Sequence, residues 1–204
     1  VYKRQDNDGF GDNPSGYEAD DCPTTQGSSF RDSFGCADED NDGMSDVNDD
    51  FLGESTQWTD TDSDGFGDDV NGTQGDFCPL EPGTSTSDVF GCVDSDSDGY
   101  SDINDVWPND ASQWYDDDMD GFGDENSGTA PDQCPDEYGT ASLGTLQGCP
   151  DTDGDGYADA DDAFPLQDSQ YLDSDGDGWG DNETSGAHKP DHWPNDPSRN
   201  AGEA

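Results

Sequence analysis

DSDSDGYSDIND, residues 94–105, is the segment from which the architecture of this chain can be read. Its acids stand at positions 1, 3, 5, 9 and 12, and Gly99 stands at position 6. Calcium loops have this spacing, because alternate carboxylates point at one centre while the glycine allows a sharp turn. The short pattern DxDGxxD occurs seven times, around Gly9, Gly43, Gly65, Gly99, Gly121, Gly156 and Gly178. Chance does not explain such regular repetition. The pattern therefore predicts about seven calcium sites, and the acidic chain offers carboxylates for further ones.

The seven patterns form two interleaved series that define a repeat. Members of the first series (Gly9, Gly65, Gly121, Gly178) lie 56, 56 and 57 residues apart, and the second series follows 34 or 35 residues later. This period predicts a linear array in which each copy contacts mainly its neighbours. The expected divisions are repeat 1 at 6–59, repeat 2 at 60–115, repeat 3 at 116–172 and a partial repeat 4 at 173–204.

The first five residues, VYKRQ, do not fit the repeat. They resemble the translated end of an adapter used in shotgun sequencing libraries, so residues 1–5 are expected to be an artefact of a metagenomic fragment. Later copies have Asp60, Asp116 or Asp173 where the first copy has Arg4. The natural residue at position 4 is therefore predicted to be Asp.

The composition excludes a conventional apolar core. The 204 residues include 53 acids and five bases, for a formal net charge of −48, and only 26% are hydrophobic. Self-repulsion predicts an unfolded chain unless metal ions and disulfides cross-link it. The charge argues against nucleic acid and anionic membranes as partners, and no apolar run reaches the ~18 residues of a membrane span.

Regular secondary structure is expected to be sparse. No window shows apolar residues at helical spacing, alternation is short, and Gly, Pro, Asn, Asp and Ser recur throughout. The predicted fold class is an irregular, calcium- and disulfide-stabilised linear repeat array with short turns and isolated bridges.

The two series of loops differ at position 12. Second-series loops carry an acid there, and their predicted calcium ligands are Asp38, Asp40, Asp42, Asp46, Asp49, Asp94, Asp96, Asp98, Asp102, Asp105, Asp151, Asp153, Asp155, Asp159 and Asp162. First-series loops have Ser15, Asn71, Ser127 or Thr184 at position 12. Their predicted ligands are Asp6, Asp8, Asp12, Asp60, Asp62, Asp64, Asp68, Asp116, Asp118, Asp120, Asp124, Asp173, Asp175, Asp177 and Asp181. As a hypothesis, a further ligand comes from outside these loops, from Asp20, Asp76, Asp132 or Asp191. A solvated acidic turn is the alternative reading of each loop.

The cysteines fall into three local pairs: Cys22 with Cys36, Cys78 with Cys92, and Cys134 with Cys149. The repeat favours one disulfide per period, each closing a loop of about 15 residues and worth ~3 kcal/mol in the chain-entropy model. Free thiols or a thiolate metal site are the alternatives, although CxxC spacing is absent and the nearby ligands are hard carboxylates. Disulfides require an oxidising compartment, which predicts an extracellular or cell-surface protein.

Taken together, the acids, glycines and cysteines of residues 6 to about 198 resemble thrombospondin type 3 repeats, whose motif is DxDxDGxxDxxD with interspersed Asp-x-Cys-Pro. The resemblance implies calcium-filled loops around a line of ions in extracellular proteins. It does not extend to EF-hands or dockerins, whose flanking helices are missing here. Each period ends in a closing segment, at 51–58, 106–114 and 163–171. The aromatic-Pro closing segments depart from the animal repeats and resemble variants in secreted microbial proteins.

Three further features have two interpretations each. The aromatic residues are expected to pack one loop on the next, and a platform for sugars is the alternative. Asn71 and Asn182 begin NGT and NET sequons and are predicted glycosylation sites, although Asn71 cannot both carry a glycan and ligate calcium through its amide. His188 and His192 are expected to be exposed, and a transition-metal site with Asp191 is the alternative.

The leading functional hypothesis is a secreted, calcium-stiffened stalk, spacer or fibre subunit, with end-to-end homo-oligomeric filaments as an extension. A calcium-dependent adhesin that binds carbohydrate or a cell-surface protein is the second hypothesis. The linker of a larger secreted enzyme is the third. Enzymatic activity within the chain itself is not expected, because no Ser or Cys nucleophile has a paired base.

Overall fold

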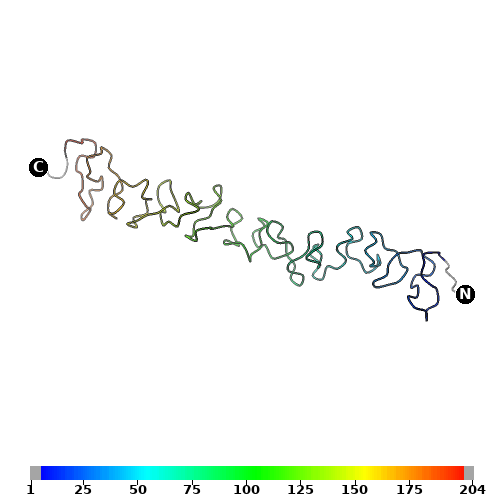
Figure 1. The fold of residues 1–204 in the computed structure, drawn as a ribbon. Coiled ribbons are helices and arrows are strands. Elements are labelled where there is room, and N and C mark those ends of the chain that lie inside the picture. Colours follow the sequence, from blue (N-terminus) through cyan, green and yellow to red (C-terminus); the bar gives the residue numbers. More distant parts are fainter. Residues whose placement is uncertain (1–5, 200–204) are drawn as a thin grey trace. The chain divides into compact units, whose positions relative to one another are not determined.

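The computed structural model describes residues 6–199, and within that range there is no helix and no extended strand (Figure 1). The sheet-like pairing recorded there consists of isolated parallel bridges: Gly11 with Ala19, Gly67 with Gly75, Asp76 with Phe90, Gly123 with Pro131, and Gly180 with Pro190. The prediction of an irregular fold is confirmed. In the described part of the chain, no segment forms an apolar helix long enough to cross a bilayer.

The chain divides into two compact units between Asn104 and Asp105, a point inside the predicted second repeat. Within each unit, the chain passes through its loops in sequence order (Figure 1). The hydrogen bonds join residues that are close in the sequence. The bond from the Gly83 N–H to Asp64, for example, spans only 19 residues. Each unit is therefore held by contacts between consecutive loops.

Three disulfides cross-link the chain, one in each full period. They join Cys22 to Cys36, Cys78 to Cys92, and Cys134 to Cys149, across Cα–Cα distances of 5.0, 5.1 and 5.0 Å. The second cysteine of each pair is buried, so each bridge lies inside its loop. The bridges restrict the unfolded chain, which is how a disulfide stabilises a fold without an apolar core.

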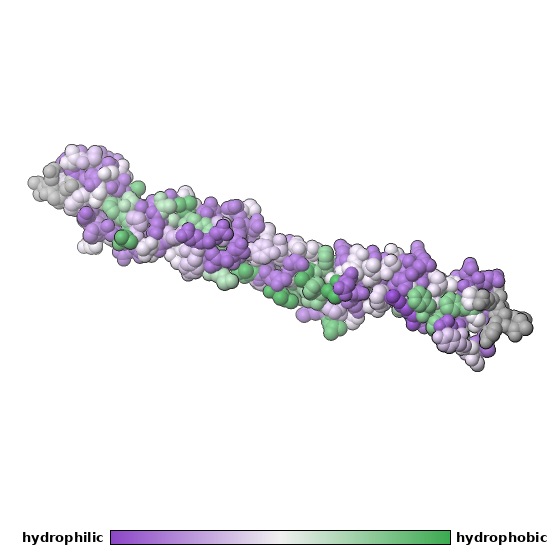
Figure 2. Space-filling view, viewed as in Figure 1, coloured by the Kyte–Doolittle hydropathy of each residue, from purple (hydrophilic) through white to green (hydrophobic). Residues whose placement is uncertain are grey.

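The buried side chains are mostly polar. The buried apolar residues of the described chain are cysteines and alanines, whereas the largest fully buried side chains are Gln57, Gln113 and Gln170. The surface is largely hydrophilic, with apolar residues in small separate patches (Figure 2). Burial of a polar group costs free energy unless a hydrogen bond or a cation satisfies it. The stability of this fold therefore depends on the partners of its buried polar groups.

Left-handed backbone conformations build the sharp turn of each acidic loop. Loop position 4 has positive φ whatever its residue, as at Asn41 (64°), Ser97 (67°) and Met119 (64°). The glycine at position 6 also has positive φ, as at Gly43 (102°) and Gly99 (101°). The φ values near 100° at position 6 lie beyond the left-handed region that position 4 occupies, which explains why position 6 is always glycine.

Candidate metal sites in the acidic loops

The first carboxylate of a loop holds the turn in shape. In the Asp38 loop, Asn41 N–H donates to Asp38 Oδ1 at 2.7 Å and Gly43 N–H donates to Asp38 Oδ2 at 3.1 Å. The loops that begin at Asp60, Asp94, Asp151 and Asp173 repeat both bonds. Position 1 thus stabilises the loop through backbone donors in addition to any role as a ligand.

Positions 3 and 5 leave oxygen atoms buried and without a hydrogen bond. Asp42 N–H donates to Asp40 Oδ1 at 3.1 Å, and Met44 N–H donates to Asp42 Oδ1 at 2.7 Å. The Oδ2 atoms of Asp40 and Asp42 are buried and lack hydrogen-bond partners. The same position-3 or position-5 atoms are orphaned at Asp6, Asp8, Asp62, Asp96, Asp98, Asp118, Asp175 and Asp177. Buried oxygens of this kind are costly unless a cation satisfies them.

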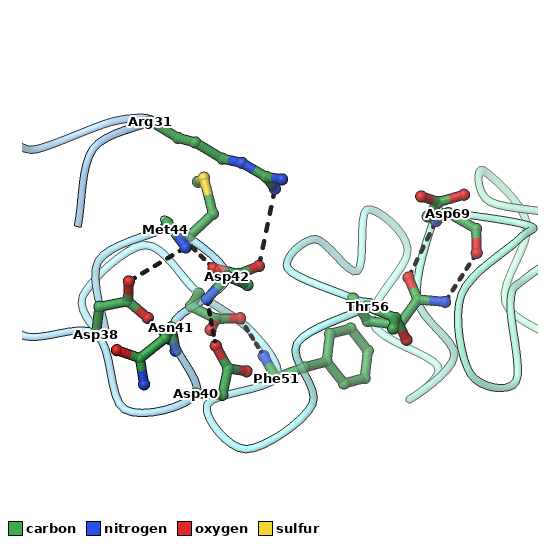
Figure 3. A network of polar contacts seen from close by, with 12 residues as sticks. Arg31, Asp38, Asp40, Asn41, Asp42, Met44, Phe51, Thr56 and Asp69 are labelled. Atoms are coloured by element: carbon green, nitrogen blue, oxygen red, sulfur yellow. Dashed lines mark hydrogen bonds and ion pairs between the residues drawn. The ribbon is translucent and has the colours of Figure 1, made fainter. Parts of the chain in front are cut away.

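The carboxylates at positions 1, 3 and 5 converge. One oxygen from each of Asp38, Asp40 and Asp42 lies within 4.8 Å of the others, and Figure 3 shows these side chains facing one another. The same holds for the groups Asp60–Asp62–Asp64, Asp94–Asp96–Asp98 and Asp116–Asp118–Asp120. Calcium–oxygen bonds of about 2.4 Å place opposite ligands at most about 4.8 Å apart, so three oxygens that converge this closely could be ligands of one cation.

Position 9 closes the loop by bonding to position 2. Asp68 accepts a hydrogen bond from Thr61 N–H at 3.0 Å and another from the Thr61 hydroxyl at 2.6 Å. These donors outweigh burial, which acts in the opposite direction, and the pKa of Asp68 lies below its ordinary value. Asp46, Asp102, Asp159 and Asp181 accept from position 2 in the same manner.

The aspartate that was hypothesised to add a ligand to each first-series loop lies beside the loop carboxylates. Gly67 O accepts the Asp76 N–H at 2.8 Å, which fixes Asp76 beside its loop. The Asp76 side chain is 2% exposed, and its Oδ2 has no hydrogen-bond partner. Burial raises the pKa of Asp76, and the charges of Asp64 and Asp62 raise it further. In the first copy, Asp20 joins Asp6 and Asp8 in one group of converging oxygens.

Asp76 occupies the role that position 12 plays in the second series. Asp76 Oδ1 accepts the Cys78 N–H at 2.6 Å, and Asp162 Oδ1 accepts the Phe164 N–H at 2.6 Å. Asp20, Asp49, Asp105, Asp132 and Asp191 each accept the same bond from the residue two positions on. The sequence shows this equivalence as two similar motifs, Asp-x-Cys-Pro and Asp-x-aromatic-Pro. The first motif lies outside the 12-residue loops, so the loop pattern alone does not reveal it.

The glycine before each second cysteine makes room for the out-of-loop acid. A Cβ on Gly91 would lie 2.2 Å from Asp76 Oδ1, and a Cβ on Gly148 would lie 2.0 Å from Asp132 Oδ1. Because both glycines also have positive φ, 74° and 78°, no other residue fits well. The metal-facing acid and the disulfide loop are thus packed against each other.

A second aspartate, not predicted from the sequence, clamps two of the second-series loops, those that begin at Asp38 and Asp94. Asp32 accepts bonds from the Ser45 hydroxyl at 2.6 Å and from Asn48 Nδ2 at 2.7 Å. Burial acts to raise the pKa of Asp32, but these donors outweigh it and hold the pKa well below the ordinary value. Asp88 binds Ser101 and Asn104 identically. Nothing in the calcium motif points to these residues, because they precede the loop by six residues.

Other side chains near the loops have individual surroundings. Arg31 lies 3.9 Å from Asp42 Oδ2 (Figure 3). It also lies 4.5 Å from the Trp58 ring centroid. The Phe66 and Phe90 rings pack at 5.7 Å. Asn71 is exposed, whereas the Asn182 amide donates to Ser169 O at 2.8 Å.

The two histidines lie near different partners. His188 N–H donates to the Ser169 hydroxyl at 3.0 Å, and His192 Nδ1 lies 3.8 Å from Glu183. Arg4, together with the other residues at 1–5, lies outside the described residues.

Known protein families and curated proteins offer no match from which a function could be inferred. No model of a known protein family matches the chain, and no curated protein is significantly similar to it in sequence. The structure and sequence define a disulfide-linked chain that has no helix within residues 6–199 and that presents several clusters of converging carboxylates there.

Proposed function

We propose that this chain is a secreted calcium-binding structural protein, similar to thrombospondin type 3 repeats, that serves as an extracellular stalk, spacer or fibre subunit. The observation that carries the proposal is the set of buried carboxylate oxygens without hydrogen-bond partners, which lie in the loops and beside them. Unpaired buried anions destabilise a fold, so their recurrence at equivalent positions supports a cation at each loop.

The donor set favours calcium over other ions. The converging atoms are carboxylate oxygens in groups of three or more, and calcium takes six to eight oxygen ligands in flexible geometry. Magnesium requires stricter octahedral geometry, and zinc prefers nitrogen and sulfur ligands. All six cysteines are in disulfides, so thiolate ligation is excluded.

Calcium would supply the stability that this composition does not. Seven ions would reduce the formal charge of −48 to about −34 and pair the orphaned oxygens. Extracellular calcium modules bind at about 10⁻⁴–10⁻³ M, so extracellular calcium would hold the chain folded by mass action. A protein of this design is suited to a mechanical role outside the cell, where its length depends on the number of repeats.

Calorimetric titration of the disulfide-intact protein tests the proposal. We expect calcium to bind with a stoichiometry of about seven ions per chain, and magnesium to bind more weakly at the same sites. Before the titration the protein is freed of calcium with a chelator that is then removed, because any chelator left in solution would itself bind the added calcium. A stoichiometry of zero or one would rule out the proposed function.

A further inference from the structure

Arg31 is the one Lys or Arg between residues 5 and 188 of this acidic chain, and its charge lies beside a candidate metal ligand. Its Nη1 atom lies 3.9 Å from Asp42 Oδ2 (Figure 3). The Asp42 side chain is fully buried, whereas Arg31 reaches it from a partly exposed position. One of the five bases of a chain with 53 acids is thus placed at position 5 of a predicted calcium loop.

Backbone and aromatic contacts hold Arg31 in this place. The Arg31 N–H donates to Gly43 O at 2.9 Å, and a Cβ on Gly43 would lie 3.1 Å from Arg31 Cγ. The guanidinium carbon lies 4.5 Å from the Trp58 ring centroid, which is within the range of a cation–π interaction. The side chain therefore passes the loop glycine and packs on the closing segment, with its charge beside Asp42.

The other second-series loops have a neutral residue at the position of Arg31. These residues are Ser87 and Leu143. Each donates its backbone N–H to the carbonyl of the loop glycine at 2.8 Å, as Arg31 does at 2.9 Å. The three positions are therefore structurally equivalent. The loop that begins at Asp38 differs from the other two in having a positive charge at this position.

The distance between Arg31 and Asp42 leaves the carboxylate oxygen available to a metal ion. A contact of 3.9 Å is an ion pair, but it is too long for a hydrogen bond. Asp42 Oδ2 accordingly has no hydrogen-bond partner, although it is buried. The guanidinium charge would repel a calcium ion bound to this oxygen. Arginine and calcium thus compete for the same negative charge.

We propose that Arg31 is a tethered cation that regulates the Asp38 loop: it lowers the calcium affinity of this loop and partly neutralises its carboxylates when calcium is scarce. This inference rests on the proposed calcium-binding function and adds that one site is tuned by a side chain of the protein. Arginine suits the role because its charge is retained at every physiological pH. As the calcium concentration falls, this loop should release its ion earlier than it would without the arginine.

Three variants of the full, disulfide-intact chain test the proposal, with NMR resonances of the loop glycine amides as site-specific reporters of calcium. Arg31→Gln removes the charge and keeps most of the side-chain length. We expect the calcium concentration at half-saturation of the Gly43 shift to fall about three- to tenfold, with no change at Gly99. Arg31→Lys keeps the charge and should leave the Gly43 value close to that of the parent. Ser87→Arg should instead raise the value at Gly99.

The salt dependence separates an effect of charge from an effect of packing. The Arg31 side chain is 42% exposed, so added salt should screen its charge and reduce the difference between the parent and Arg31→Gln. A difference that is independent of salt would contradict the proposed role of the charge. The Gly99 resonance shows whether Arg31→Gln folds, and Ser87→Arg tests the proposal by itself if it does not.

A half-saturation value at Gly43 that is unchanged or higher in Arg31→Gln would overturn the proposal, because the arginine then does not compete with calcium. So would an unchanged value at Gly99 in Ser87→Arg. These outcomes leave calcium binding itself intact. Absence of calcium-dependent shifts at every loop glycine of the parent would instead contradict the proposed function, and this inference with it.

Discussion

The carboxylate of Asp76 connects a metal site to a disulfide. One oxygen accepts the Cys78 N–H, and the other is buried without a hydrogen-bond partner. The charges of Asp64 and Asp62 contribute to the raised pKa of Asp76, which places their carboxylates nearby. A residue that is 2% exposed and pressed against Gly91 has little freedom to move away from a cation. Under the proposed function, Asp76 is a ligand supplied from outside the loop.

Replacement of Asp76 by Asn tests this role. We expect the variant to bind one calcium ion fewer, or to bind one ion at least tenfold more weakly, because a neutral amide replaces a buried charge. Calorimetric titration measures both quantities. Glu81→Gln is the matched control, since Glu81 is an exposed acid in the same disulfide loop. Unchanged binding in Asp76→Asn would remove Asp76 from the ligand set.

The raised pKa values predict how calcium binding depends on pH. Burial is the first cause of the raised pKa at Asp20, Asp49, Asp62, Asp76, Asp98, Asp118, Asp124, Asp132, Asp155, Asp162 and Asp175. Charges of neighbouring loop acids add to it. Such groups retain protons at a pH where ordinary aspartates are ionised, and calcium must displace these protons.

Calcium affinity is therefore expected to fall, and proton release per ion to rise, as the pH decreases towards the raised pKa values of these carboxyls. Without calcium the sign is reversed: a raised pKa in the folded state means that stability from these carboxyls is lost as the pH rises. Calorimetry in two buffers of different ionisation enthalpy measures the protons released. An affinity that stays constant as the pH falls from 7 to the ordinary pKa range of aspartate, about 4, would contradict the burial of these carboxylates.

At the scale of structural elements, the closing segments transmit order from one loop to the next. The glutamine of each segment is fully buried and satisfies backbone groups about 12 and 16 residues away, as Gln113 does with Glu125 and Thr129. In a helix or strand, other backbone groups would satisfy these N–H and C=O groups. In this irregular backbone, the glutamine side chain supplies those hydrogen bonds instead.

Removal of the Gln113 amide should therefore weaken one junction. Gln113→Ala leaves the Glu125 N–H and two carbonyls unpaired, and we expect a loss of about 2–3 kcal/mol in unfolding free energy. Urea unfolding in saturating calcium measures the change. Gln133→Ala changes an exposed glutamine in the same unit and should have little effect. Equal stability of the two variants would show that the buried amide is not important for the junction.

The disulfides should contribute independently of the metal. Replacing Cys78 and Cys92 together by Ala opens a loop of about 15 residues, and we expect a loss of about 3 kcal/mol. Thermal unfolding in saturating calcium, compared with unfolding of the parent protein, measures the loss. A double variant that unfolds at the parent temperature would mean that calcium alone orders this loop.

At the scale of the whole molecule, the sequence predicted the irregular fold because its physical basis is visible in the composition and the spacing. Few apolar residues, frequent turn formers and a charge of −48 leave no means of building helices or sheets around a core. The disulfides expected from one cysteine pair per period are present in the structure. The converging acids at positions 1, 3 and 5 follow from the same loop pattern.

Other contacts could not be predicted because they depend on polar side chains that satisfy an irregular backbone. Asp32 and Asp88 lie outside the loops that they clamp. They recur 56 residues apart in a shared Asp-x-Phe-Gly-Cys segment, but the calcium motif does not include that segment. Gln57 lies beside Trp58 in a closing segment, and in these segments the expected packing contacts were those of the aromatic residues. A three-dimensional structure was needed to show which backbone groups lacked partners.

Limited proteolysis of the disulfide-intact protein, in saturating calcium and in excess chelator, tests the central claim most directly. If calcium bound to carboxylates replaces an apolar core, the chain should resist protease with calcium and be cleaved rapidly throughout residues 6–199 without it, and readdition of calcium should restore resistance. Equal resistance in chelator, at unchanged hydrodynamic radius, would contradict the account.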